Sequence, residues 1–326
     1  MSSDQNGLHV PARVIPVPTS ISPEAQAFLA HKPPIGMGDL PGPDDHAAWR
    51  EKRAETDAMI VGISRLSAAR WPADVVTHPL PNALLYEISP HSLDPANERR
   101  AILYVHGGGF YMGGGEAAVL AAQPYAGQAR CKVYSLDYRM APEHPFPAGL
   151  DDAVDAWKWL LERYRPGNMA ATGASAGGNL APALVLKLRD LGLPLPAACA
   201  VHSPASDMTE SGDTYQTNTV IDTVLQRPLP ELMHIYCRDH DRRDPLLSPC
   251  FADYSKGFPP TVLTSGTRDL LLSSTVLLHR AMRRGGVKAE LHVFEAMTHA
   301  PFFGAPEAQE LQDELVDFML THMGSD

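Results

Sequence analysis

The chain has 326 residues, 44% of them hydrophobic, which is enough for a sizeable globular core. Its formal net charge of −11 argues against nucleic acid and against an anionic membrane surface as partners. The four cysteines have no metal-binding spacing, no apolar run approaches the ~18 residues of a membrane span, and there is no signal-peptide core. We therefore expect a cytoplasmic protein with free thiols and with neither a cofactor nor a metal.

The N-terminal part of the chain predicts an irregular segment followed by one helix. Residues 1–43 are rich in Pro, Gly and Ser and show no sustained period. Residues 44–70 show helical periodicity, although Lys52 and Arg53 interrupt its apolar side near the start. That apolar side carries Trp49, Met59, Ile60, Ile63 and Leu66.

From residue 84 onwards, predicted strands alternate with predicted helices. The strands cover residues 84–88, 101–105, 132–136, 169–172, 198–202, 261–264 and 288–294. The helices cover residues 116–130, 147–165, 230–236, 270–284 and 305–319, and one more follows Ser175. Helices of this length between strands favour parallel pairing with right-handed crossovers. The fold class is therefore α/β, with a doubly wound, mostly parallel sheet.

Residues 205–255 break this alternation and predict an insertion after a sheet strand. The segment is rich in turn-forming residues, and such an insertion is where a lid over a site would lie. Its acidic stretch contains Asp239, His240, Asp241 and Asp244. We interpret this stretch as a carboxylate-rich turn and not as a metal site.

The pentapeptide GASAG at residues 173–177 lies between a predicted strand and a predicted helix. Gly173 and Gly177 leave room for a tight turn that lifts the hydroxyl of Ser175 clear of the sheet. The same turn aims the N-terminus of the next helix at the group that the hydroxyl attacks. This pattern is the nucleophile elbow. On its own, the same pattern is also compatible with a plain Gly/Ser-rich loop.

A second glycine-rich motif, HGGGF at residues 106–110, follows the strand predicted at residues 101–105. Successive glycines lose much conformational entropy on folding, and their backbone N–H groups are accessible to a ligand. Combined with the elbow, this motif supplies the oxyanion hole of lipases and esterases. A third block, DYRMAPEHPFPA, occupies residues 137–148.

These three blocks, in this order, resemble the hormone-sensitive-lipase-like branch of the α/β-hydrolases, and especially its bacterial esterases. The resemblance extends from about residue 80 to the C-terminus. It implies an N-terminal segment with cap helices over residues 1–75 and a catalytic α/β-hydrolase domain over residues 76–326. A cap insertion is expected at about residues 205–255.

The resemblance also assigns roles to the glycine-rich motif. It implies that the backbone N–H groups of Gly108, Gly109 and Ala176 form the oxyanion hole. His106 is expected to brace this loop and not to transfer protons. Dimers are frequent among such esterases, so a homodimer is also expected.

A serine hydroxyl is a weak nucleophile at neutral pH and needs a histidine base oriented by a carboxylate. Of the four late histidines, His279, His292, His299 and His322, only His299 follows a predicted strand on a loop, where α/β folds bind ligands. Asp269 also follows a predicted strand, at a position where aspartate is a common helix N-cap. Asp253, in a turn before that strand, is the alternative carboxylate.

We therefore expect a carboxylic-ester hydrolase that acts on short to medium acyl esters through Ser175, Asp269 and His299. Small-molecule esters or lactones are the expected substrates, and a lactonase or amidase would use the same machinery. An alternative from a different functional class is a catalytically silent binding protein. The plant gibberellin receptors are an example, since they share this fold but have lost the catalytic histidine. The pocket is expected to include Phe110, Tyr111, Met112, Met208 and Tyr215.

Three positions depart from the pattern of the resembling family. The residue before the serine is Ala174, where an acid or threonine is frequent. Asp269 is followed by Leu-Leu-Leu-Ser-Ser, without the second acid that often follows the catalytic one. Ala300 replaces the usual glycine after the histidine. These departures concern the substrate and the geometry of the histidine loop, not the class of chemistry.

Overall fold

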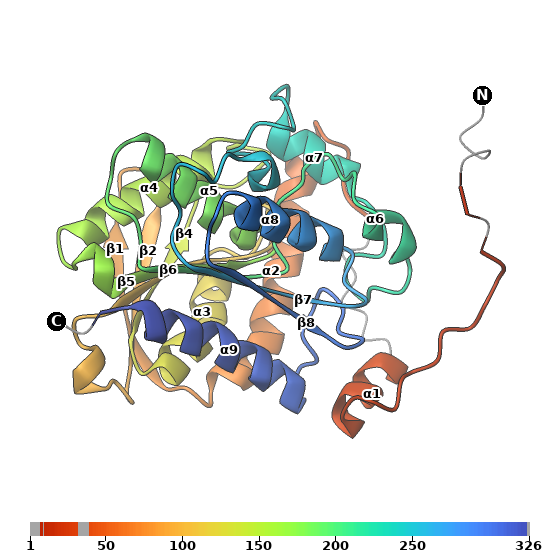
Figure 1. Ribbon diagram of the computed structural model, residues 1–326, viewed down its shortest axis with the longest axis horizontal. Helices are drawn as coiled ribbons and strands as arrows, with labels where there is room; N and C mark the ends of the chain where they lie inside the picture. The colour runs from red at the N-terminus through yellow and green to blue at the C-terminus, as the bar shows by residue number, and fades with distance from the viewer. Residues whose placement is uncertain (1–6, 9, 32–38, 325–326) are drawn as a thin grey trace.

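The computed structural model describes residues 7–8, 10–31 and 39–324. Its centre is one eight-stranded sheet (Figure 1). In spatial order the strands are β1 (Ala73–Pro79), β2 (Leu84–Pro90), β4 (Lys132–Asp137), β3 (Ala101–Val105), β5 (Met169–Ala174), β6 (Ala198–His202), β7 (Thr261–Gly266) and β8 (Ala289–Phe294). The pairs β1–β2 and β2–β4 are antiparallel, and all others are parallel. The predicted doubly wound, mostly parallel sheet is confirmed.

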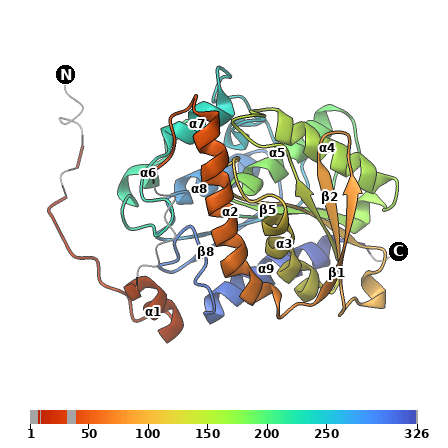
Figure 2. The ribbon, with the colours of Figure 1, turned by 180° about the vertical axis from the view of Figure 1, so that it is seen from behind.

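Helices cover both faces of the sheet (Figure 1). One face carries α3 (Glu116–Ala129) and α9 (Pro306–His322), and the other carries α4 (Ala148–Leu161), α5 (Ala176–Asp190) and α8 (Leu272–Arg284). Helix α2 (His46–Ala68) runs across the molecule and packs against α3 (Figure 2). Single turns of 3-10 helix occur at η2 (Pro95–Asn97), η3 (Pro166–Asn168) and η4 (Pro249–Phe251).

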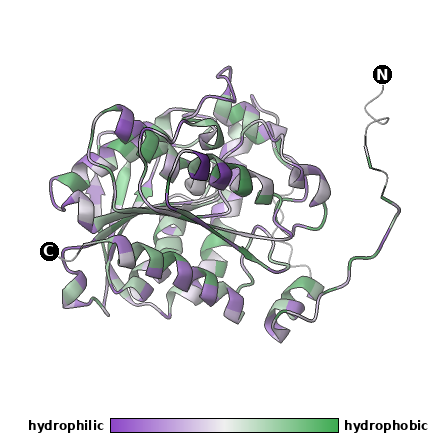
Figure 3. Cartoon of the chain, in the orientation of Figure 1, coloured by the Kyte–Doolittle hydropathy of each residue, from purple (hydrophilic) through white to green (hydrophobic). Residues whose placement is uncertain are grey.

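The core lies on both sides of the central strands. In β3, Leu103 and Val105 pack into the core on one face, whereas Ile102 and Tyr104 pack into the core on the other. A strand buried on both faces requires a continuous apolar run, as in the sequence AILYV. Figure 3 shows the same partition, with apolar residues gathered on the strands and on the helix sides that face them. No helix among the described residues is both long enough and apolar enough to cross a membrane.

Helix α1 and strand β1 were absent from the sequence-based predictions. Helix α1 (Pro23–His31) lies within the segment predicted to be irregular, and part of that segment falls outside the described residues. The side chain of Phe28 packs on Phe302, with ring centroids 5.5 Å apart, and Glu307 accepts hydrogen bonds from Ser22. Strand β1 is largely exposed and pairs only with β2. Both elements depend on tertiary contacts more than on local periodicity.

Helix α2 agrees with the prediction in its bounds but less well in its apolar side. Trp49 is buried, and its indole N–H donates to the carbonyl of Gly42 at 3.0 Å. Leu66, by contrast, is 82% exposed, and Ile63 is also exposed. The apolar side therefore faces the core only in the first half of the helix.

Residues 205–255 form the predicted insertion between β6 and β7. They contain the short helix α6 (Thr214–Thr217) and helix α7 (Pro230–Cys237), the latter where a helix was predicted. Helix α7 lies beside the N-terminal half of α2 in both ribbon views (Figures 1 and 2). Two segments distant in sequence therefore meet at one place, above the strand ends that carry the site.

Candidate active site

Ser175 lies at the turn between β5 and α5, with a backbone φ of 56° in the left-handed region. A Cβ added to Gly173 would lie 2.7 Å from the carbonyl oxygen of Val105. One added to Gly177 would overlap that same oxygen and approach the carbonyl of His106 to 2.6 Å. The neighbouring strand thus comes so close that only glycine fits on either side of the serine. The predicted elbow geometry is present.

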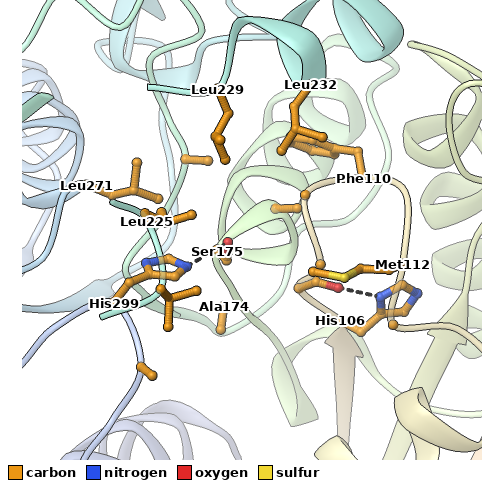
Figure 4. A pocket seen from close by; sticks show the side chains of 18 of the residues that line it. His106, Phe110, Met112, Ala174, Ser175, Leu225, Leu229, Leu232, Leu271 and His299 are labelled. Carbon is orange, nitrogen blue, oxygen red and sulfur yellow. Dashed lines mark hydrogen bonds between the residues drawn. The ribbon is translucent and has the colours of Figure 1, made fainter. Parts of the chain in front are cut away.

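Ser175, His299 and Asp269 form a continuous hydrogen-bonded chain. The Nε2 atom of His299 lies 3.0 Å from Ser175 Oγ, and its Nδ1 atom lies 3.2 Å from Asp269 Oδ1. His299 comes from the loop after β8, and Asp269 from the loop after β7. Figure 4 shows the imidazole pointing at the serine hydroxyl across the floor of a cavity. The three residues singled out from the sequence are therefore brought together.

Asp269 is fully buried, and every contact of its carboxylate is with a donor. Ser265 donates to Oδ2 at 2.6 Å, Ser203 donates to the same oxygen, and the backbone N–H of Leu271 donates to Oδ1 at 2.9 Å. Burial alone would raise the pKa of Asp269, but the hydrogen bond and charge of His299, with the two serine hydroxyls, lower it to about 2. The carboxylate is therefore ionised at neutral pH. Its bond to the N–H two residues on forms a turn directly before α8, which begins at Leu272 with Leu271 as its N-cap and without a side-chain cap, so the helix N-cap role predicted for Asp269 as an alternative is wrong.

The pKa of His299 is raised above its ordinary value. Burial acts to lower it, but the hydrogen bond and charge of Asp269, together with the charge of Asp222, outweigh burial. His202 on β6 also faces this group, and burial lowers the pKa of His202 to about 4, so it is neutral at physiological pH. These contacts stabilise the protonated form of the ring, which makes His299 a stronger base than a free imidazole.

The other candidate residues lie away from Ser175. His279 is in the middle of α8, His292 on β8 contacts Glu314 at 2.6 Å, and His322 ends α9. Asp253 is exposed, and its side chain accepts hydrogen bonds from Ser255. The alternative assignment of Asp253 is therefore wrong, because it is not placed to contact His299.

The loop that carries the three glycines turns sharply beside Ser175. Gly108 and Gly109 have φ values of 117° and 57°, which glycine adopts without strain. Within the described part of the chain, their N–H groups donate to no other backbone group, which leaves them available to a ligand. His106 lies beneath this loop, where Nδ1 donates to the carbonyl of Gly107 at 2.7 Å and the ring stacks on Tyr138. Burial lowers the pKa of His106, so the ring is neutral, as expected of a bracing residue.

Helix α2 holds the far side of the same loop through two charged residues that we did not identify from the sequence. The guanidinium of Arg53 donates to the carbonyl of Tyr111 at 2.5 Å and to that of Ala141 at 2.7 Å. It also forms an ion pair with Glu143 at 2.7 Å. The carboxylate of Asp57 accepts from the N–H of Gly113 at 2.6 Å. The position of Arg53 on the apolar side of the predicted helix was the one available signal for these contacts.

A cavity of about 560 Å³ opens above Ser175, and its walls are mainly apolar. It is lined by four of the five residues predicted for the pocket, Phe110, Met112, Met208 and Tyr215. The prediction for Tyr111 is wrong: this residue is fully buried and packs on Trp49, with ring centroids 5.0 Å apart. Residues 108–112 form a tight turn in which the N–H groups of Tyr111 and Met112 both donate to the carbonyl of Gly108 at 3.1 Å and Phe110 has a left-handed φ of 64°, so neighbouring side chains leave it in different directions.

Side chains from the insertion at residues 205–255 and from α2 line this cavity. In Figure 4, Leu229 and Leu232 lie above Ser175, with Leu232 beside Phe110, and Leu225 lies beside His299. From α2, the lining residues are Lys52, Glu55, Thr56, Met59 and Ile60. The cavity is thus enclosed by segments that are remote in the sequence.

The acidic stretch of the insertion has a structural explanation. Asp241 accepts from the N–H of Arg243 at 2.9 Å, and Asp244 accepts from that of Leu246 at 2.8 Å. These are the local turn contacts typical of aspartate. Among the residues that the structure describes, no three His, Cys, Asp or Glu side chains are grouped so as to hold a metal ion.

Comparison with known proteins places these features in a family. A family model described as alpha/beta hydrolase fold matches residues 102–303. The chain belongs to the α/β-hydrolase fold family. It is 30% identical to an acetyl-hydrolase of Streptomyces hygroscopicus over 77% of this chain and 84% of that protein. It is 31% identical to an ethyl acetate hydrolase of Pseudomonas putida over 77% of this chain and 81% of the relative.

Solved structures agree with the sequence relatives. One crystal structure of an esterase superposes with a TM-score of 0.90 at 33% identity, covering 98% of this chain and 100% of that one. An esterase of the bacterial hormone-sensitive lipase family gives a TM-score of 0.78 at 28% identity, covering 93% and 99%. The resemblance inferred from the three motifs is confirmed. The protein is an esterase-type hydrolase of carboxylic esters.

Proposed function

We propose that the protein hydrolyses small-molecule carboxylic esters with short to medium acyl chains through an acyl-enzyme on Ser175. The observation that supports this most strongly is the chain of contacts from Ser175 Oγ to His299 Nε2 at 3.0 Å and from His299 Nδ1 to Asp269 Oδ1 at 3.2 Å. Nucleophile, base and orienting carboxylate follow in the order Ser, Asp, His that is characteristic of this fold.

In the proposed mechanism, His299 removes the proton of Ser175 as its oxygen attacks the acyl carbon. The negative charge that forms on the acyl oxygen is stabilised by the N–H groups of Gly108, Gly109 and Ala176, the last at the N-terminus of α5. Removing one such donor typically costs ~10²–10³ in kcat. His299 then protonates the leaving alcohol and activates a water molecule that releases the acid.

Asp269 has two roles in this proposal. Its contact with Nδ1 keeps the proton of the neutral imidazole on that nitrogen, which leaves Nε2 free to accept from Ser175. Its charge then stabilises the imidazolium that forms during each step. Ser203 and Ser265 hold the carboxylate in place by donating to its other oxygen.

We also propose that α2 and the insertion at residues 205–255 act as a cap over residues of the catalytic domain. The cap would include α2 and end before β1, since β1 is part of the sheet and contains residue 75. An apolar cavity of about 560 Å³ favours short and medium acyl chains. Long chains would exceed it.

The assignment of the nucleophile is tested by Ser175→Ala and by an organophosphate. The variant is expected to fold with the thermal midpoint of the wild type and to hydrolyse p-nitrophenyl acetate near background, because the covalent route is absent. The organophosphate should add once per chain, and peptide mass spectrometry should locate it on Ser175. Labelling at another residue, or full turnover in the alanine variant, would refute the proposal.

The substrate range is tested with p-nitrophenyl esters from C2 to C16, γ- and δ-lactones and p-nitroanilides. We expect the highest kcat/KM on short and medium acyl chains, and no increase in rate when the substrate forms an emulsion. A preference for C16 emulsions would contradict the bounded cavity. Faster turnover of lactones or anilides than of any open-chain ester would assign the same machinery to a lactonase or an amidase.

A further inference from the structure

Asp222, in the insertion between α6 and α7, contacts both loops that carry the proposed acid and base. It is only 1% exposed. Its Oδ2 atom accepts from the backbone N–H of Leu270 at 2.8 Å and from that of His299 at 3.1 Å. Leu270 directly follows Asp269. A single carboxylate oxygen therefore binds the backbone next to Asp269 and the backbone of His299 itself.

The other oxygen of Asp222 fixes the segment to which it belongs. Oδ1 accepts from the N–H groups of Val224 at 2.8 Å and of Leu225 at 3.1 Å, and both of these residues line the cavity. The adjacent hydroxyl of Thr223 lies 2.8 Å from that of Thr298, the residue before His299. Residues 222–225 thus connect the cap insertion to the histidine loop and to the acid loop at once.

Burial raises the pKa of Asp222, while the charge of His299 and the backbone N–H donors oppose that shift. The hydrogen-bonding pattern is that of an ionised carboxylate. All four partners of Asp222 are N–H donors, so both oxygens act as acceptors. Such charge-assisted bonds are shorter and stronger than neutral ones. No acid follows Asp269 within the next five residues of the sequence, which read Leu-Leu-Leu-Ser-Ser. The charged acceptor that binds these two loops is Asp222, from the insertion at residues 205–255.

We propose that Asp222 is a positioning residue that fixes the loops of Asp269 and His299 relative to each other and couples their alignment to the folding of the cap insertion. This inference depends on the proposed function, since it concerns the same reaction. Asp222 does not contact Ser175 or the cavity floor, so it acts through His299 and Asp269 and not on the substrate.

Asp222→Asn is the appropriate variant, because asparagine has the same shape and a single acceptor oxygen. If that oxygen stays with Val224 and Leu225, the turn is preserved, but an amide N–H₂ group then faces two N–H donors. The wall of the cavity should persist, while the histidine and acid loops move apart. We expect kcat on p-nitrophenyl butyrate to fall by up to about 10²-fold, as for a misplacement of ~1 Å, with KM changed by less than about threefold.

The pH profile distinguishes a positioning carboxylate from a merely structural one. His299 must be neutral to act as base, so kcat/KM rises as pH increases through its pKa. The groups that face its imidazole are Asp269, Asp222, Ser175 and the neutral His202. Because the charge of Asp222 contributes to raising the pKa of His299, loss of that charge should move the acid limb to lower pH. A change of packing alone would leave this limb in place.

Asp244→Asn is the matched control. Asp244 lies in the same insertion and caps a similar turn by accepting from the N–H of Leu246, but none of its contacts involves the triad loops. Its kcat, KM and acid limb should equal those of the wild type. A wild-type kcat and an unmoved acid limb in Asp222→Asn would overturn the proposal.

Two further measurements keep the outcomes separable. If Asp222→Asn does not fold, Thr223→Val is tested in its place, because it removes only the contact with Thr298. We then expect a several-fold loss of kcat with an unchanged acid limb. An unchanged kcat in Thr223→Val would overturn the proposal. Organophosphate labelling of the wild type at Ser175 tests the proposed function separately. A wild type that is labelled there and active, with Asp222→Asn equally active, refutes this inference alone.

Discussion

Replacement of Asp269 by asparagine separates the two roles that the structure gives this residue. The Oδ1 atom contacts both the Nδ1 atom of His299, at 3.2 Å, and the backbone N–H of Leu271, at 2.9 Å. The first contact belongs to the proposed triad, and the second to the start of α8. This second contact is a turn contact to the N–H two residues on, which asparagine makes as aspartate does, so the variant should keep it.

The stability of Asp269→Asn should change little. With its oxygen at the Oδ1 position, asparagine still accepts from Leu271, and its N–H₂ group faces the hydroxyls of Ser203 and Ser265, which rotate to accept. The charge-assisted bonds from the two serines are weakened, but the burial of a charge is relieved. We expect the free energy of unfolding to change by less than about 1 kcal/mol.

Catalysis should nevertheless collapse in the same variant. With its oxygen at the Oδ1 position, the neutral amide no longer stabilises the imidazolium. In the reversed orientation its N–H₂ group faces Nδ1 and favours the imidazole tautomer with the proton on Nε2, which cannot accept from Ser175. The same substitution in a serine-protease triad costs about 10⁴ in kcat. Because Asp269 raises the pKa of His299, its neutralisation should also move the acid limb of kcat/KM to lower pH.

The assay pairs the thermal midpoint by circular dichroism with kcat on p-nitrophenyl acetate between pH 5 and 9. Asp253→Asn is the matched control, since Asp253 is an exposed aspartate that contacts Ser255 and not His299, and its kcat should equal that of the wild type. Near-normal turnover of Asp269→Asn together with a lowered midpoint would show that the residue only stabilises the turn before α8. The reasoning about the triad would then be refuted.

Two further predictions concern the elbow and the loop beside it, and denaturant unfolding and turnover check both. Gly177→Ala should lower the free energy of unfolding by about 3 kcal/mol and abolish activity, because its Cβ would overlap the carbonyl of Val105. Gly62→Ala is the matched control: Gly62 has open space around it in α2, so this variant should raise the free energy of unfolding by about 0.5–1 kcal/mol. Arg53→Met should cost about 1–3 kcal/mol and reduce kcat, because two carbonyls lose their donor. Arg50→Met should cost less than about 1 kcal/mol, since Arg50 is exposed. Equal effects within either pair would contradict these explanations.

The parts of the site that the sequence revealed are those in which chemistry constrains neighbouring residues. The elbow needs small residues on both sides of Ser175, so its signature is contiguous in the chain. His299 and Asp269 follow strands of a parallel sheet, and the ends of such strands meet at one edge. Strands β3 and β6 matched their predicted bounds for a related reason, since strands buried on both faces are short continuous apolar runs.

Other features depended on contacts between distant segments and had no local signal. Tyr111 is adjacent to the oxyanion loop in sequence, but the left-handed backbone at Phe110 directs its ring to Trp49 and not to the cavity. Asp222 lies in a turn-rich segment in which many aspartates only cap turns. Nothing in the sequence distinguishes it from Asp241 or Asp244, because its partners are 48 and 77 residues away.

The two parts of the proposed cap, α2 and the insertion at residues 205–255, make polar contacts with the loops of the proposed site. Arg53 and Asp57 on α2 bind the backbone of the loop that would stabilise the oxyanion, whereas Asp222 in the insertion binds the loops that would supply the base and its carboxylate. Each part of the cap therefore holds one half of the proposed catalytic apparatus. Because these contacts are made to backbone atoms, they fix the positions of the loops whatever ligand occupies the cavity. It follows that substitutions at these cap residues should alter kcat more than KM, whereas substitutions of the apolar lining, such as Leu229 or Leu232, should alter chiefly KM and acyl-chain preference.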